Sequence, residues 1–340
     1  MGKNFPLITT LKENPQLFDK TLSLIEKSFL YQAPFTFKED FSPLISAENH
    51  HNCFIVIDEN ENVLAHVGAR DSFITIDNKK FPVTMLGGIA VDEKFRGEGH
   101  FQNLFQDVLA EKRSDTAFFL LWSDLEKLYN KYSFHLCGHQ FEVEKSSTKN
   151  SFIQTKFQLL SADERKNIIA LYENSFSKAF VTLSRSDKEW NELAGVMSAD
   201  LYIKKTSEII TDYFFMNKGQ DLPGVIYEYG SERELAKLIP EISGYGKLWM
   251  GSELSPTDQL HYQFFMAPGD LKLFTDFVSA FTGNKISLRN INLMKQEAYF
   301  DFNEELMALD LPDFLRGLFG PGTFEELELK PIFISGLDSI

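Results

Sequence analysis

The first half of the chain alternates between strand-like and helix-like hydrophobic patterns. Apolar residues recur at nearly helical spacing over residues 15–29, which predicts a helix there. Residues 53–58, 63–76 and 81–91 are apolar runs separated by short polar turns, and this arrangement predicts an antiparallel meander. After residue 99 the period changes, and one helical stripe contains Phe101, Leu104, Phe105, Val108 and Leu109. An amphipathic helix should therefore follow the meander directly.

The pattern then returns to strands before the chain becomes polar. Residues 117–122 are apolar throughout, as in a strand buried on both faces within the parallel part of a sheet. A short helix over residues 125–132, capped by Ser123-Asp124, and a strand over 139–145 complete this unit. Residues 145–151 are polar and aperiodic, so we predict one domain over residues 1–147 and another over 148–340.

The second half repeats a similar order of elements. Helices are expected over residues 162–176, 187–197 and 232–239, and strands over 201–204, 209–216 and 225–229. The apolar run 330–340 is expected to close the second domain as a strand. The fold class is therefore α/β (α+β), with a duplicated architecture of two mixed, mostly antiparallel sheets flanked by helices.

Composition narrows the range of partners. A chain of 340 residues with 43% hydrophobic residues can build about two cores. The net charge of −15 disfavours nucleic acid and anionic membranes as partners, and it suits a cationic substrate such as an amine. Two cysteines far apart, Cys53 and Cys137, indicate reduced thiols in a cytoplasmic protein. No apolar run is long enough for a signal peptide or a membrane span, and assembly into a homo-oligomer stays open.

A glycine-containing loop joins the meander to the amphipathic helix. It reads Arg96-Gly97-Glu98-Gly99-His100-Phe101. The free N–H groups and the dipole of a helix N-terminus favour a phosphate, and glycines let the ligand approach the backbone. Arg96 adds a positive charge, and the Glu98 side chain can turn to solvent while the amides bind. The loop alone leaves two interpretations open, which are a phosphate site and a plain strand–helix turn.

Two motifs together resemble the GCN5-related N-acetyltransferase (GNAT) superfamily. The first is Arg/Gln-x-x-Gly-x-Gly/Ala at the start of a long helix, and the second is Tyr-x-x-x-Gly-Phe, here Tyr129 to Phe134. Phe101 stands where the family has a small residue, and Ser133 stands where it has a glycine. The resemblance covers residues 50–143. It implies a mixed α/β domain with acetyl-CoA as the acyl donor.

The resemblance also implies where the donor binds. Its pyrophosphate would lie on the amides of Arg96, Gly97, Glu98, Gly99, His100 and Phe101. Its pantetheine arm would follow Ile89, Ala90 and Val91, in an opening between this strand and residues 117–122. Tyr129 matches the tyrosine that protonates the CoA thiolate; the alternative is a half-buried packing role.

The two-lobed plan resembles the enhanced-intracellular-survival type of acetyltransferases, without their third domain. In that group the terminal carboxylate reaches the active site, so the resemblance suggests that the Ile340 carboxylate, or Asp338, accepts the proton of the amine. The alternative is a C-terminal strand that only completes the second lobe. The strand over residues 83–91 offers no carboxylate for this role.

The predicted function is therefore direct transfer of an acetyl group from acetyl-CoA to a primary amine of a small molecule or peptide. Two rivals remain, which are a non-catalytic CoA-binding regulator and a tandem-GNAT aminoacyl transferase. The last would need charged tRNA, a poor partner for so acidic a protein. His50-His51 and the pair His135 and His139 lack zinc-ligand spacing with a partner cluster, so no metal site is predicted.

Overall fold

The computed structural model describes residues 6–143, 151–255, 257–322, 324 and 326–340. The predicted domain boundary between residues 147 and 148 lies outside these residues. No helix in the described ranges combines the length and the apolar character that crossing a membrane would take.

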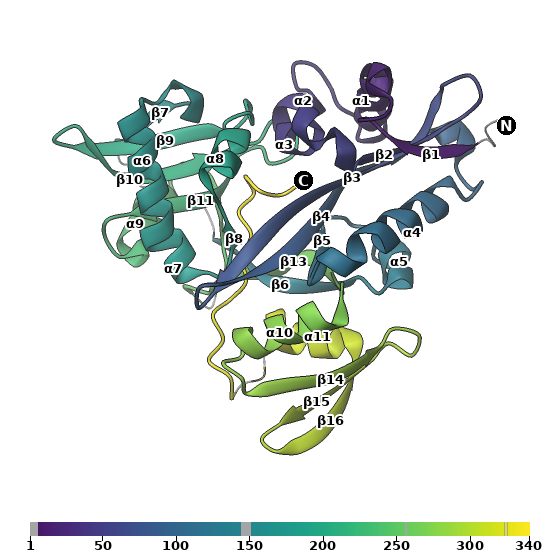
Figure 1. Cartoon of the computed structure of the whole chain (residues 1–340). Coiled ribbons are helices and arrows are strands. Elements are labelled where there is room, and N and C mark those ends of the chain that lie inside the picture. The colour runs from purple at the N-terminus through teal and green to yellow at the C-terminus, as the bar shows by residue number, and fades with distance from the viewer. Residues whose placement is uncertain (1–5, 144–150, 256, 323, 325) are drawn as a thin grey trace.

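A single mixed sheet runs through both predicted domains (Figure 1). Among the described residues its order is β1-β2-β3-β4-β5-β13-β6-β12-β11-β10-β9-β7, with β8 paired to β3. The strands are β1 Leu7–Thr10, β2 Cys53–Ile57, β3 Val63–Ile76, β4 Lys79–Val91, β5 Phe118–Leu121, β6 His135–Val143, β7 Ile153–Thr155, β8 Leu183–Ser184, β9 Asp200–Thr206, β10 Ile209–Met216, β11 Val225–Ser231, β12 Lys247–Met250 and β13 Gln259–Pro268. The figure shows helices on both faces of this sheet.

The first lobe confirms the predicted meander and the amphipathic helix. Strands β2, β3 and β4 pair in antiparallel fashion, and β5 joins β4 in parallel. Helix α4 (His100–Lys112) buries its apolar stripe, including Leu104 and Phe105, in the same cluster as the β3 residue Leu64. Helix α1 (Phe18–Ser28) buries Leu24 and Ile25 in a different cluster. Burial of one stripe per helix thus fixes both helices against the sheet.

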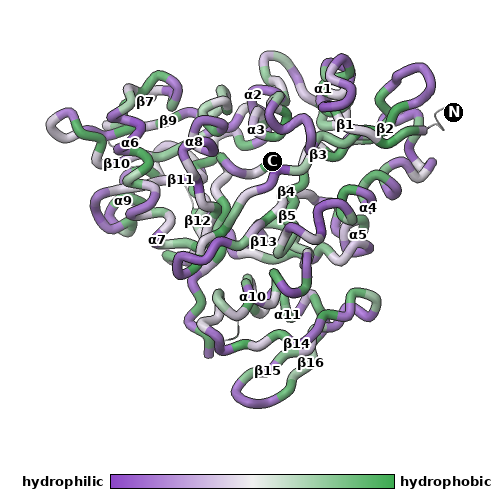
Figure 2. Tube along the Cα trace, in the orientation of Figure 1, coloured by the Kyte–Doolittle hydropathy of each residue, from purple (hydrophilic) through white to green (hydrophobic). Residues whose placement is uncertain are grey.

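The second lobe contains the predicted strands β9, β10 and β11, which pair in antiparallel fashion. Its helices are α6 (Ala162–Leu171), α8 (Asp187–Leu193) and α9 (Leu235–Ile242). A capping box starts α6, because Ser161 and Glu164 bond each other's backbone amides. Hydrophobic and hydrophilic residues alternate along the helices of both lobes (Figure 2).

The two lobes exchange strands, which the sequence analysis did not anticipate. Strand β13 from the second half inserts between β5 and β6 of the first half and pairs with both. Phe264 and Phe265 of β13 are fully buried. Insertion satisfies the backbone groups at the edges of β5 and β6, which would otherwise lie unpaired beside an apolar core.

Residues 271–319, within the range predicted for the second lobe, form a further layer apart from the main sheet. Strands β14 (Ile286–Asn292), β15 (Glu297–Phe302) and β16 (Glu305–Asp310) form a separate antiparallel sheet covered by α10 (Leu271–Phe281) and α11 (Leu311–Phe319). Phe277 of α10 packs on Phe118 of β5, with ring centroids 4.7 Å apart. Figure 1 shows this layer below the central strands.

The C-terminal segment is not the strand expected from its apolar pattern. Ile332 makes one isolated parallel bridge to Val181, and the structure assigns no strand over residues 331–340. Side chains satisfy its backbone instead: the Gln263 amide donates to the Ile334 carbonyl (2.8 Å) and accepts from its N–H (2.9 Å). The segment runs between the lobes and ends near β3 and β4 (Figure 1).

Candidate active site

A cleft of about 1380 Å³ opens where β4 separates from β5. The parallel pairing of these strands ends at Leu86 and Leu121, whereas β4 continues to Val91 beside β3. Residues Gly87 to Val91 line the cleft, so one edge of this strand faces open space. Its backbone groups are available to pair with an extended ligand that carries amides.

A bulge in β4 shapes this open edge. Gly88 has a φ of +58°, and the β3–β4 register shifts between His66 and Gly68. His66 is fully buried, and burial lowers its pKa to about 4, so the ring is neutral. Its Nδ1 lies 2.7 Å from the Gly88 carbonyl oxygen, and therefore Nδ1 carries the proton and donates to the bulge.

The glycine loop forms one end of the cleft. Gly97 and Gly99 have φ values of +87° and +85°, and a Cβ on either would meet nothing within 4 Å. The first hydrogen bond of α4 runs from the Asn103 N–H to the Gly99 carbonyl (3.0 Å), so the amides just before Asn103 have no intrahelical acceptor. Open space, free amides and the positive helix end together suit a diphosphate.

Charged side chains complete this end of the cleft. Arg96, His100 and Lys131 line it, whereas Glu98 does not. The Glu98 carboxylate lies 3.3 Å from His100 Nε2. Arg96 of the loop and Lys131 of the turn after α5 (Glu126–Tyr129) therefore present positive charges to the cleft, whereas the Glu98 side chain does not line it.

Phe101 joins the core beside the loop. Its ring stacks on Phe105 (centroids 5.1 Å apart) and meets Tyr129 and Tyr132 edge-on. The bulky side chain thus packs along the α4 stripe, and its backbone stays at the start of the helix. This placement removes the conflict between a phenylalanine at this position and a ligand on the amides.

Tyr129 lies at the end of the short helix α5 (Glu126–Tyr129) and lines the same cleft. It is 4% exposed, packs against Phe105 and Phe265, and bonds the Ser123 side chain. Burial raises the pKa of its phenol to about 12, so the proton is present at neutral pH. A protonated phenol therefore lines the cleft at neutral pH.

Ser133 keeps the turn after Tyr129 in the left-handed conformation that a glycine would adopt easily. Its φ is +65°, and its Oγ accepts a hydrogen bond from Gln296 Nε2 (2.8 Å). Gln296 Oε1 also lies 2.8 Å from His135 Nε2. Contacts from the additional layer thus hold the turn despite the missing glycine.

The C-terminal segment brings Ile340 to the open edge of β4. A Cβ built on Gly87 would lie 2.5 Å from the Ile340 carbonyl carbon. Ile340, Ser339 and Gly336 line the cleft together with Tyr129. The cleft therefore gathers the loop, the open strand, the tyrosine and the last residue, which are far apart in sequence.

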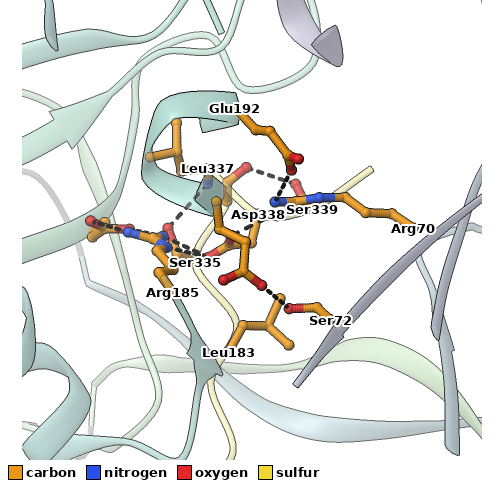
Figure 3. Close-up of polar contacts among 12 residues, drawn as sticks. Arg70, Ser72, Leu183, Arg185, Glu192, Ser335, Leu337, Asp338 and Ser339 are labelled. Carbon is orange, nitrogen blue, oxygen red and sulfur yellow. Dashed lines mark hydrogen bonds and ion pairs between the residues drawn. The ribbon is translucent and has the colours of Figure 1, made fainter. Parts of the chain in front are cut away.

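Asp338 occupies a different position from Ile340. It is 1% exposed, does not line the cleft, and accepts hydrogen bonds from Arg185 Nε (3.0 Å) and Nη2 (2.6 Å) (Figure 3). Arg70 Nη1 lies 3.7 Å from its other oxygen. Two guanidinium groups thus engage the carboxylate, and the prediction of Asp338 as a proton acceptor is wrong.

The far wall of the cleft is aromatic, and sequence reasoning missed it. Its lining residues come from the α1–α2 segment, β12, β13 and the loop after β10, and include Phe29, Tyr31, Trp249, Tyr262 and Asp221. Burial raises the pKa of the Asp221 carboxyl. These residues share no motif, because only strand exchange and lobe packing bring them together. The histidines at 50, 51, 135 and 139 belong to no group of three or more metal-ligating side chains within the described ranges.

Replacing Arg96 by glutamine should raise the KM for acetyl-CoA about fivefold and leave kcat nearly unchanged. Arg96 is exposed, so the loss of its charge near a phosphate should cost only about 1 kcal/mol. Steady-state kinetics at low and high salt measure the KM of both proteins. Because salt screens the charge of Arg96, the difference in KM should be smaller at high salt. A fivefold loss of kcat without a change in KM would contradict a role in donor binding.

Known proteins resemble this chain at two levels. Residues 12–137 match the sequence model of the family described as Acetyltransferase (GNAT) domain. Among curated proteins, none matches. Several solved structures share the fold at low sequence identity.

Three of these structures cover most of the chain. A probable N-acyltransferase from Enterococcus faecalis V583 is 14% identical over 89% of this chain and 84% of its own, with a TM-score of 0.58. Eis1 from Mycobacterium abscessus is 9% identical over 89% of this chain and 85% of its own, with a TM-score of 0.57. The Saccharomyces cerevisiae N-myristoyltransferase with bound myristoyl-CoA is 10% identical over 79% of this chain and 80% of its own, with a TM-score of 0.52. At these identities the likeness establishes the fold.

Proposed function

We propose that this chain moves an acetyl group from acetyl-CoA to a primary amine. Its residues 12–137 match the family described as Acetyltransferase (GNAT) domain, which supports the proposal. The observation that supports this most is the meeting of four features in one cleft: the open edge of β4, the loop at Gly97 and Gly99, the Tyr129 phenol and Ile340. The plan matches what direct transfer between two bound substrates requires.

The donor would lie along the loop and the strand. The amides of Gly97, Gly99, His100 and Phe101 would hold the pyrophosphate, with the Arg96 guanidinium beside it. The Arg96 and Glu98 amides already donate to the Glu93 and Phe95 carbonyls (3.4 Å each). Ile89, Ala90 and Val91 would pair with the amides of the pantetheine arm, because β5 leaves their edge open after Leu86. The thioester then reaches the bulge at Gly88, close to Ile340.

Transfer needs three proton and charge adjustments. An alkyl amine has a pKa near ~10.4, so a neutral amine costs roughly 4 kcal/mol at neutral pH. A backbone N–H near Val91 would polarise the thioester carbonyl. As the new C–N bond forms and the C–S bond breaks, the Tyr129 phenol would donate its proton to the thiolate.

The carboxylate of Ile340, where that residue ends the chain, would take the proton of the amine. Gly87 leaves room for it directly on the open edge. Extending the C-terminus by a few glycines should then lower kcat by about 10²-fold, since a general base contributes that much. An equal extension at the N-terminus is the matched control, and intact mass confirms the terminus. Full activity in the C-terminally extended protein would exclude this base.

Incubation with acetyl-CoA and a panel of amines, with release of free thiol as the readout, tests the function as a whole. We expect amine-dependent thiol release and an acetylated product of the corresponding mass. Binding of acetyl-CoA without turnover would favour a regulator, and transfer from charged tRNA would favour an aminoacyl transferase. Failure to bind acetyl-CoA would overturn the proposal.

A further inference from the structure

We propose that the second lobe positions the end of the chain for the reaction: Lys218 and Arg185 hold residues 336–339 so that Ile340 stays against Gly87. The inference rests on the proposed function, because it assigns Ile340 a role in the cleft. Lys218 and Arg185 are positioning residues and neither touches the reacting atoms.

Lys218 lies in the loop after β10, and its side chain is fully buried. Its Nζ donates to the Ser339 carbonyl oxygen (2.6 Å), the Gly336 carbonyl oxygen (2.9 Å) and Ser339 Oγ (3.1 Å). The Ser339 carbonyl belongs to the peptide bond that leads into Ile340. A buried ammonium therefore binds the backbone one residue before Ile340.

The loop that carries Lys218 is itself fixed to the first lobe. Asp40 of helix α2 (Phe37–Asp40) accepts hydrogen bonds from the Gln220 N–H (3.1 Å) and the Tyr31 hydroxyl (2.8 Å). The Lys218 ammonium lies 4.1 Å from the centroid of the Phe41 ring, a cation–π distance. The ammonium is thus held relative to both the cleft and the tail, as we call residues 331–340.

Arg185 grips the tail from the other side. Its guanidinium pairs with Asp338, bonds Glu228 of β11 through Nη1 (3.0 Å), and lies 4.2 Å and 4.5 Å from the ring centroids of Tyr172 and Trp190. The charges of Asp338 and Glu228 raise its pKa despite burial. Figure 3 shows Arg185 and Arg70 meeting at the tail from opposite lobes.

This arrangement is better suited to fixing a position than to adding stability. Buried ion pairs lose much of their attraction to desolvation, and apolar replacements often match them in stability. Here three buried cations, Lys218, Arg185 and Arg70, converge on a tail of irregular backbone. Gln263 and Val181 hold residues 331–334. The three cations contact residues 336–339, which form no strand ladder.

The hydrogen bonds of Lys218 to Gly336 and Ser339 should weaken in alkaline solution. Burial lowers its pKa to about 8, against the opposing charges of Asp221, Asp40 and Asp338 and with a reinforcing contribution from Arg70. The charged form is present below that pH and is lost as the pH rises through it. Turnover should therefore fall above about pH 8, and Tyr129, with a pKa of about 12, cannot cause that limb.

The test compares K218M and K218R with the unaltered protein. K218M should lower kcat by about 10²-fold near neutral pH and leave the KM for acetyl-CoA within about twofold, because the tail moves and the donor loop does not. K218R should restore most of kcat and shift the alkaline limb upward, since a guanidinium stays charged. K156M is the matched control: Lys156 also belongs to the second lobe and donates to the Met197 and Ala199 carbonyls (3.0 Å each), away from the tail.

A double variant separates positioning from general damage. If Lys218 acts through Ile340, K218M should have no further effect on kcat in the C-terminally extended protein. S339A removes one Lys218 acceptor without leaving a buried charge, and it should lower kcat severalfold even if K218M fails to fold. An unchanged kcat in both K218M and S339A would overturn the inference. So would a K218M substitution that lowers kcat as much in the C-terminally extended protein as in the unaltered one. Absence of acetyl transfer by the unaltered protein would instead overturn the proposed function.

Discussion

Replacing Tyr129 by phenylalanine is expected to lower kcat by about 10²-fold or more and to leave the KM for acetyl-CoA within about twofold. In the proposed mechanism this phenol is the proton donor, and it lines the same cleft as the open edge of β4. Phenylalanine keeps the ring packing against Phe105 and Phe265 and removes only the proton. Steady-state thiol release at varied acetyl-CoA concentration measures both kcat and KM.

Tyr132 provides the matched control for this substitution. It also lines the cleft and packs edge-on against Phe101, yet the proposed mechanism gives its hydroxyl no part. Tyr132→Phe should retain kcat within about twofold. The acid role of Tyr129 fails if Tyr129→Phe turns over normally. It also fails if the two variants lose the same activity.

Gly87→Ala is expected to lower kcat by about 10²-fold, because displacement of a catalytic group by about 1 Å costs that much. The new methyl group would lie 2.5 Å from the Ile340 carbonyl carbon and 2.8 Å from its oxygen. Both atoms are backbone, so the tail must move away from β4. Thermal unfolding should show only the modest destabilisation of overpacking, about 1–3 kcal/mol.

Gly68→Ala is the comparison for this variant. Gly68 lies directly opposite Gly87 in the β3–β4 pair. Its Cβ would meet the flexible Leu44 side chain (2.9 Å) and, less closely, the Gly87 carbonyl oxygen (3.1 Å), and its three nearest contacts do not include Ile340. Gly68→Ala should therefore lose stability while keeping kcat. If Gly87→Ala keeps full kcat as well, Ile340 takes no part in the reaction.

Local patterns in the sequence predicted much of the first lobe and half of the site. The meander, helix α4 and the loop between them depend on contacts between residues close in sequence, and each has a recognisable period or turn signal. Tyr129 was also predictable, because it lies close in sequence to the aromatic residues that pack on the apolar stripe of α4. Their meeting in one cleft was expected from the resemblance.

The failures also have physical causes. The tail was expected to be a strand because Pro331 to Ile334 are apolar, but its backbone partners are the Gln263, Lys218 and Val181 groups, far away in sequence. The insertion of β13 between β5 and β6 is equally invisible to local pattern, since any apolar strand could occupy that edge.

The sequence by itself determined the elements of the proposed donor site, which are a strand, a glycine loop, a helix and a tyrosine. These follow from hydrophobic period and backbone freedom, which are local properties. Only the tertiary structure decided where Ile340 lies, that Asp338 is paired with two guanidinium groups, and which cations hold the tail. Lys218 and Arg185 carry no motif, and they matter because strand exchange and lobe packing bury them against a segment more than a hundred residues away.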